Sequence, residues 1–229
     1  MTRYAVCLEQ VEGRWVGHVP ALPGCFTSEP ERAAAEVRVP AAIADYLAWR
    51  VAHGDRAVPV DEVAEAEVEE IALEWPCPAD PEYMVNAFFA SDAVPLSEAD
   101  IAQVRSLLAW TRADLLASVA DLEVEQLERP VEDDWSIRRI LDHVGGAEGW
   151  YLSRLGLAAP QADPGEWRAR LELARTRLLE VLPGLVGLTR LELHRGETWS
   201  ARKMLRRALW HERDHTEHIR QFRRRLGLG

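Results

Sequence analysis

The sequence predicts an α+β protein with two domains, a small βββαβ domain followed by an all-α four-helix bundle. Three observations predict this class. Apolar residues alternate in the first part of the chain, they recur every three or four positions in the second half, and a Pro-containing acidic stretch lies between. A chain of 229 residues is long enough for two cores. We therefore assign residues 1–75 to the first domain, 76–95 to a linker and 96–229 to the bundle.

The first domain is predicted to begin with a β-hairpin. Tyr4, Val6 and Leu8 alternate with less apolar neighbours, and Gly13 marks the turn to a second strand. A third short strand is expected at 25–28, after a Pro-Gly turn. A helix is expected at about 30–52, and a last strand at 68–75 on the edge of the sheet.

The second half is predicted to be helical throughout. Serines and acidic residues precede several apolar-periodic segments, and Pro or Gly follows them, as at helix ends. The expected helices span about 97–122, 136–156, 164–182 and 200–226. Four helices of similar length with short connections are typical of a four-helix bundle.

Composition and charge exclude several classes of protein. No stretch has the roughly 18–20 apolar residues of a membrane span, and no signal peptide is evident, so we expect a cytoplasmic protein with no membrane partner. The net charge of −11 arises entirely in residues 1–95, which hold 17 acidic residues and six arginines. That acidity disfavours nucleic acid as a partner. The three cysteines form no CxxC pair and are predicted to be reduced thiols.

The histidines of the last predicted helix carry the main functional signal. His211 and His215 lie about 40° apart around the helix, and His218 lies about 20° to the other side of His211. All three share the apolar stripe that is expected to face the core. An i, i+4 pair on this stripe places two imidazoles within reach of one ion.

A metal site of this kind needs a third ligand. His143, at the edge of the apolar stripe of helix 136–156, is the main candidate, and His194 and His218 remain alternatives. Three histidines would leave a coordination position open, which is the arrangement of catalytic rather than structural zinc sites.

The order of these motifs resembles the DinB-like (DNA-damage-inducible) family. The resemblance rests on Trp135-Ser136-Ile137, then His143, then the run WHERDHTEHI at 210–219. It implies an up-down-down-up four-helix bundle, a homodimer, and zinc, nickel or a similar divalent ion as cofactor. It also implies that His143, His211 and His215 are the metal ligands and that His218 is not a main ligand.

Other residues are predicted around the metal. Glu148 is a candidate to orient a ligand, because metal-bound imidazoles usually donate their second N–H to a carboxylate or carbonyl. Trp135, Trp150, Trp210 and His218 could line a pocket, and the tryptophans could equally fill the core.

The first domain resembles the HicB-like antitoxin domain. The string WVGHVPALPGC at 15–25 and the helix ending in AAIADYL carry this resemblance, which covers about residues 3–75. The sequence departs from the family pattern after Ser28 and lacks its DNA-binding segment. The resemblance therefore implies a fold and a binding role.

Three functions follow from these features. The first is a metal-dependent hydrolase or low-molecular-weight-thiol transferase, whose partners would be a small thiol and a small electrophilic substrate. The second is a non-catalytic, metal-stabilised binding or stress-response module that uses the HicB-like domain for recognition. The third is the antitoxin partner of a small toxin. An open coordination position that faces a pocket would favour the enzyme.

Overall fold

The computed structural model describes residues 2–56, 64–78, 80–131, 135–158 and 164–228. These residues form two compact units. The first comprises Met1–Ala93 and Leu193–Trp199, and the second comprises Val94–Glu192 and Ser200–Gly229. The first unit holds a mixed β-sheet with a helix and the second a helical bundle, which confirms the predicted α+β class.

The main sheet of the first unit has the strand order β3-β2-β1-β4. Its elements are β1 (Thr2–Val11), β2 (Arg14–His18), β3 (Phe26–Glu29), α1 (Arg32–Ala52) and β4 (Ala64–Ala72). Strand β1 pairs antiparallel with β2 and parallel with β4, so β4 lies at an edge, as expected. Strand β4 begins earlier than predicted, because its first apolar positions are small alanines that give a weak alternation signal.

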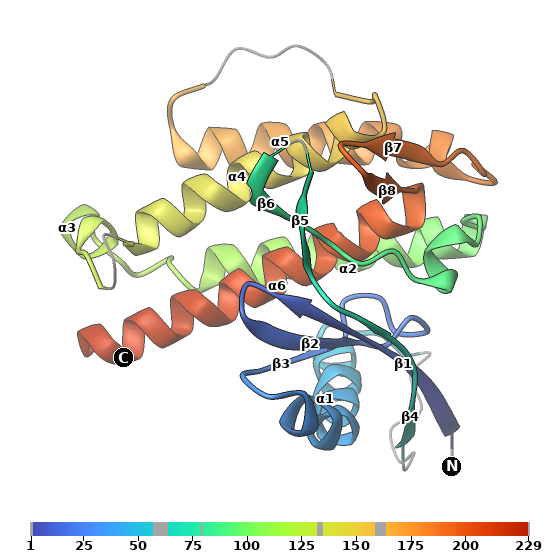
Figure 1. Cartoon of the computed structure of the whole chain (residues 1–229). Helices are drawn as coiled ribbons and strands as arrows, with labels where there is room; N and C mark the ends of the chain where they lie inside the picture. The colour runs from blue at the N-terminus through green and yellow to red at the C-terminus, as the bar shows by residue number, and fades with distance from the viewer. Residues whose placement is uncertain (1, 57–63, 79, 132–134, 159–163, 229) are drawn as a thin grey trace. The chain divides into compact units, whose positions relative to one another are not determined.

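Helix α1 packs on one face of this sheet (Figure 1). Neighbouring strands of the sheet leave no room for a side chain at Gly17 in β2. A Cβ at this position would lie 2.7 Å from Thr27 Oγ1 and 3.1 Å from a methyl carbon of Leu8. The side chains of Val39 and Ile43 on α1 are fully buried there.

The segment predicted as a linker forms regular structure in the first unit. It contains β5 (Trp75–Cys77), β6 (Asp80–Val85) and the short 3-10 helix η1 (Ala90–Ala93). Strands β5 and β6 pair with each other. The predicted boundaries at 75/76 and 95/96 therefore differ from those of the compact units.

A second small hairpin joins the first unit from far along the chain. It consists of β7 (Glu192–His194) and β8 (Glu197–Trp199), and it was not predicted. Cys77 Sγ donates to the carbonyl oxygen of Arg195 at 2.9 Å, and Tyr83 donates to the buried carboxylate of Glu197. Arg195 and Gly196 both have positive φ, as a two-residue type I′ turn requires.

The second unit is built from four long helices, which run side by side (Figure 1). They are α2 (Glu98–Ala117), α4 (Ile137–Arg154), α5 (Trp167–Val181) and α6 (Ala201–Leu226), with the short α3 (Val124–Glu128) and the 3-10 helix η2 (Leu182–Leu185) between them. Helix α4 packs against α5 and α6, and α6 packs against α2. None of the described helices is long and apolar enough to cross a membrane.

Serine side chains set the starts of three of these helices. Ser97, Ser136 and Ser200 precede α2, α4 and α6, and each side chain accepts a hydrogen bond from a backbone N–H of the first turn. Helix α6 ends at Gly227, whose φ of 68° allows the left-handed cap. The observed start of α4 agrees with the predicted start near residue 136.

Candidate metal centre

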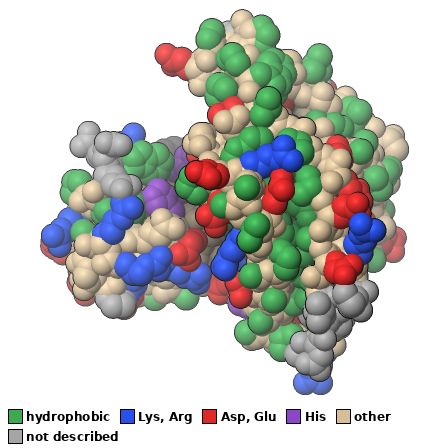
Figure 2. Space-filling view, turned by 60° about the horizontal axis from the view of Figure 1, so that its bottom comes forward, with side chains coloured by type: hydrophobic (Ala, Val, Ile, Leu, Met, Phe, Trp, Pro, Cys, Tyr) green, Lys and Arg blue, Asp and Glu red, His purple; other side chains and the backbone are tan. Residues whose placement is uncertain are grey.

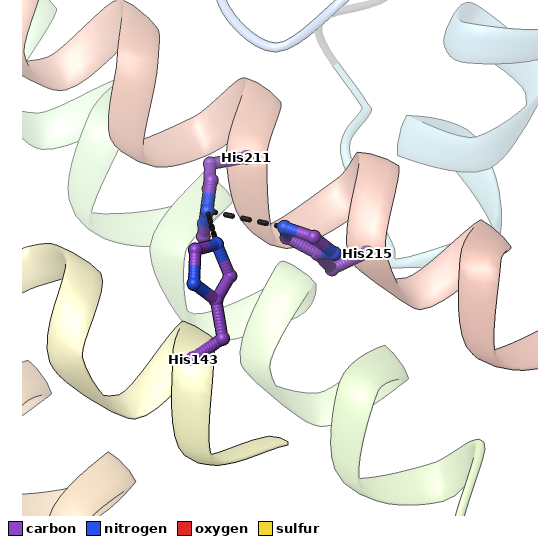
Figure 3. A group of neighbouring side chains, drawn as sticks. All are labelled: His143, His211 and His215. Carbon is purple, nitrogen blue, oxygen red and sulfur yellow. Dashed lines mark hydrogen bonds between the residues drawn. The ribbon is translucent and has the colours of Figure 1, made fainter. Parts of the chain in front are cut away.

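Three histidines of the second unit meet between α4 and α6. His143 extends from α4, and His211 and His215 extend from α6 (Figure 3). Nε2 of His211 lies 2.9 Å from Nε2 of His143 and 3.1 Å from Nε2 of His215. We call these three residues the histidine triad. The structure thus brings together the three predicted ligands at the contact of α4 with α6, although His143 and His211 lie 68 residues apart in sequence.

The distances within the histidine triad fit a shared cation. Tetrahedral zinc binds imidazole nitrogens at about 2.0–2.1 Å, which places such nitrogens about 3.3–3.4 Å from one another. The observed spacings are slightly shorter. A proton can bridge only two of these nitrogens at a time, whereas one metal ion can accept a lone pair from all three. Imidazole donors suit zinc, nickel, iron and copper alike.

Burial and neighbouring groups favour the neutral form of His211, the central histidine of the triad. Burial, reinforced by His215, His143 and then Arg207, lowers the pKa of His211 well below its usual value. His211 is therefore neutral at pH 7, and a neutral imidazole is the form that binds a metal.

The histidine triad is buried on one side and accessible on the other. His211 is buried and His215 is half-buried, but His143 is exposed. Histidine side chains are visible on the surface in Figure 2, beside hydrophobic ones. A small molecule could therefore reach the triad from the side of His143.

Aromatic rings surround the histidine triad. Trp135 lies edge-on to His143 with ring centroids 5.8 Å apart, and Tyr151 and Trp210 lie 6.0 and 6.3 Å from His211. Trp150 packs against Tyr151 at 5.3 Å. Of the three predicted tryptophans, Trp135 and Trp210 therefore adjoin the triad directly, and Trp150 adjoins it through Tyr151.

His218 lies beside the histidine triad but is not part of it. Its ring is 6.0 Å from that of His215 and 4.4 Å from that of Phe222. His194, the other alternative ligand, is in β7 and belongs to the first unit. In the same unit His18 forms a buried pair with Glu9 at 2.7 Å.

Glu148 belongs to a second polar cluster, which we call the ionic cluster. This cluster contains one residue from each long helix of the bundle, namely Arg112, Glu148, Arg175 and Glu212. Arg175 donates to Glu148 at 2.5 and 2.8 Å and to Glu212 at 2.6 Å. The structure therefore places Glu148 against arginines, and not among the three residues that could hold a metal.

Sequence reasoning missed Arg112, Arg175 and Glu212, although a signal was present. Arg175 lies one turn from the buried residues Leu171 and Leu178, so it occupies the core stripe of its helix. A charged residue on such a stripe needs an opposite charge nearby.

The ionic cluster shifts the pKa values of its two carboxyl groups in opposite directions. Burial raises the pKa of Glu148, although Arg175 and Arg112 oppose the shift. Burial alone would also raise the pKa of Glu212, but Arg175 and Arg112 outweigh it and lower this pKa below its usual value. The Glu212 carboxylate also accepts a hydrogen bond from Thr111.

Comparisons with known proteins agree with the bundle. Residues 107–219 match the model of the DinB superfamily. A similar solved structure is that of YfiT from Bacillus subtilis, described as a probable metal-dependent hydrolase with an unusual four-helix bundle topology. That match has 19% sequence identity and a TM-score of 0.50, and it covers 63% of this chain and 95% of YfiT. A search of curated proteins found no match. Residues 107–219 therefore resemble the DinB superfamily, and the bundle has a fold like that of YfiT.

Proposed function

We propose that this protein is a divalent-metal-dependent hydrolase, or a transferase of a low-molecular-weight thiol, that acts on a small electrophilic substrate. The observation that carries the proposal is the convergence of three imidazole nitrogens, one of which belongs to the exposed side chain of His143. The description of YfiT as a probable metal-dependent hydrolase supports the first of these activities.

Each residue of the site has a distinct part in this proposal. His143, His211 and His215 would hold the ion, with zinc or nickel as the main candidates. A divalent ion bound there would supply Lewis acidity and lower the pKa of a water or a thiol. Trp135 and Trp210 would exclude bulk water around the site, and the exposed edge of His143 would admit the substrate.

The remaining predictions belong to the same proposal. They are the up-down-down-up order of the helices, a homodimer, and a HicB-like first unit that recognises a ligand or a protein. The alternative function is a metal-stabilised binding module without turnover, in which the ion only braces the bundle.

Metal analysis followed by activity assays tests the proposal. The purified protein should bind about one divalent ion per chain, and the loaded protein should hydrolyse model esters or amides, or transfer a small thiol to an electrophile. His143→Ala should lose both the ion and the activity. An ion that binds but supports no reaction in either assay would favour the bracing module, and a protein that binds no ion would refute both functions.

A further inference from the structure

The ionic cluster joins the two helices that carry the histidine triad. Arg175 on α5 contacts both carboxylates, since its Nη2 lies 2.5 Å from Glu148 Oε1 and 2.6 Å from Glu212 Oε2. Glu148 is on α4 with His143, and Glu212 is on α6 next to His211. One guanidinium group therefore bridges the two ligand-bearing helices.

A second arginine completes this connection. Arg112 on α2 donates from Nε to Glu212 Oε1 at 2.5 Å and from Nη2 to Glu148 Oε1 at 3.3 Å. The two arginines also tie their own helices together, because Arg175 donates to the carbonyl oxygen of Leu108 on α2 and Arg112 donates to that of Leu171 on α5. Helices α2 and α5 thus form a support that holds α4 and α6 through paired charges.

Helix geometry links these contacts to the direction of the histidines. On α6, His211 and His215 lie about 100° and 60° around the axis from Glu212, and both on the same side of it. On α4, His143 lies about 140° from Glu148. A helix whose carboxylate is held by two arginines cannot rotate about its axis without breaking those bonds. Each ligand-bearing helix is fixed in this way.

We propose that Arg175, assisted by Arg112, is a positioning residue that sets the spacing of the histidine triad by holding Glu148 and Glu212. This inference rests on the proposed metal function, and it assigns a role to residues that do not contact the triad's converging nitrogens. The four side chains of the ionic cluster are at least 89% buried. The cluster is formally neutral, with two arginines and two glutamates. Buried ion pairs contribute little net stability compared with apolar residues, which makes a positioning role a sufficient reason for their presence.

A charge-balanced variant separates positioning from stability. Arg175→Met alone leaves two buried carboxylates that share one arginine, so it should destabilise the fold. Arg175→Met with Glu148→Gln leaves the neutral pair Arg112–Glu212 and should recover much of that stability. If Arg175 positions the histidines, the double variant should still bind Co²⁺ about 10–100-fold more weakly than the unaltered protein. Its visible Co²⁺ absorption bands should also shift, because these bands report ligand geometry.

Two further variants keep the test decisive. Arg175→Lys retains the positive charge but loses the bidentate hydrogen bonding of the guanidinium group, so it should also weaken Co²⁺ binding. This variant replaces the methionine variants in the test if they fail to fold. Leu178→Ala, one turn along α5, removes a fully buried side chain that is not a member of the ionic cluster. It should lower stability and leave the Co²⁺ affinity and spectrum of the folded protein unchanged.

The results distinguish this inference from the proposed function. If the unaltered protein binds no Co²⁺ or Zn²⁺, the metal function itself is wrong. If it binds Co²⁺ and the folded Arg175 variants bind with the same affinity and spectrum, the metal function stands and the positioning role is refuted.

Discussion

The bundle contains two polar clusters, and they differ in how their buried polar atoms are paired. In the ionic cluster, guanidinium donors face carboxylate acceptors, and Glu148 and Glu212 are almost fully buried. In the histidine triad, nitrogen faces nitrogen, and one of the three rings is exposed. The first cluster finds its opposite charges within the chain, whereas the second could hold a cation. Buried charges that are paired within the chain suit a supporting role in the bundle. Three imidazole nitrogens that converge on one point suit a metal-binding site.

The largest expected effect is on metal binding. His211→Ala removes the nitrogen that lies closest to both other members of the histidine triad, so the bound metal should fall from about one ion per chain to none. The measurement is elemental analysis of protein dialysed against Zn²⁺. His218→Ala, one turn beyond His215, is the matched control and should keep the ion. Equal metal content in the two variants would show that the triad is not the site.

Substitutions in the ionic cluster should lower the unfolding free energy of the protein. Arg112→Met leaves Glu148 and Glu212 with one arginine, and breaking a buried pair in this way costs about 3–5 kcal/mol of unfolding free energy. Urea denaturation of the metal-free protein measures this loss. Arg138→Met removes pairs with Glu128, Asp142 and Glu166 that are more exposed to solvent, so it should cost about 1 kcal/mol or less. A small loss for Arg112→Met would contradict the view of this cluster as a framework.

Removal of a helix cap should lower the unfolding free energy by an intermediate amount, without changing either polar cluster directly. Ser136→Ala removes the acceptor for the backbone N–H of Arg139 at the start of α4, which should cost about 1 kcal/mol of unfolding free energy. Metal content should not change. Ser153→Ala, at an exposed position near the other end of α4, should leave both quantities unaltered. Loss of metal in Ser136→Ala would show that the start of α4 also positions His143.

The smallest effect should come from an exposed ion pair. Arg223 donates to both carboxylate oxygens of Asp121, at 2.6 and 2.8 Å, and its hydrogen bonds are the main cause that lowers the pKa of Asp121 to about 2. Because the folded pKa lies below the unfolded value of about 3.9, the pair stabilises the fold above about pH 4. That stabilisation should be lost as the pH falls from about 4 to 2.

Stability measured against pH tests this pair. Asp121→Asn should flatten the stability curve between about pH 4 and 2, where the unaltered protein loses the contribution. Arg223→Gln should flatten the same interval, and the double variant should add nothing further. Independent, additive effects of the two substitutions would mean that Asp121 titrates without help from Arg223.

The features that local sequence patterns predicted are those confined to one element. His211 and His215 lie four residues apart on one helix, so their proximity follows from the helical repeat. The meeting of His143 with them depends on which helices pack together, and the family resemblance was needed to select it. The ionic cluster was missed because its four members come from four helices. The hairpin of β7 and β8 was missed because three-residue strands are too short to show alternation.

That hairpin also changes how the two units can be separated. The chain leaves the first unit after Ala93, returns for Leu193–Trp199, and leaves again at Ser200, the cap of the helix that carries His211 and His215. A gene fragment that ends near residue 93 would lack the partners of Cys77 and Tyr83, and a fragment for the bundle alone would carry an orphan hairpin. Each unit is therefore discontinuous in sequence, and the two units do not simply follow one another along the chain. Recombination that exchanges one unit as a single block would break the other, so the pair is expected to be inherited and varied together.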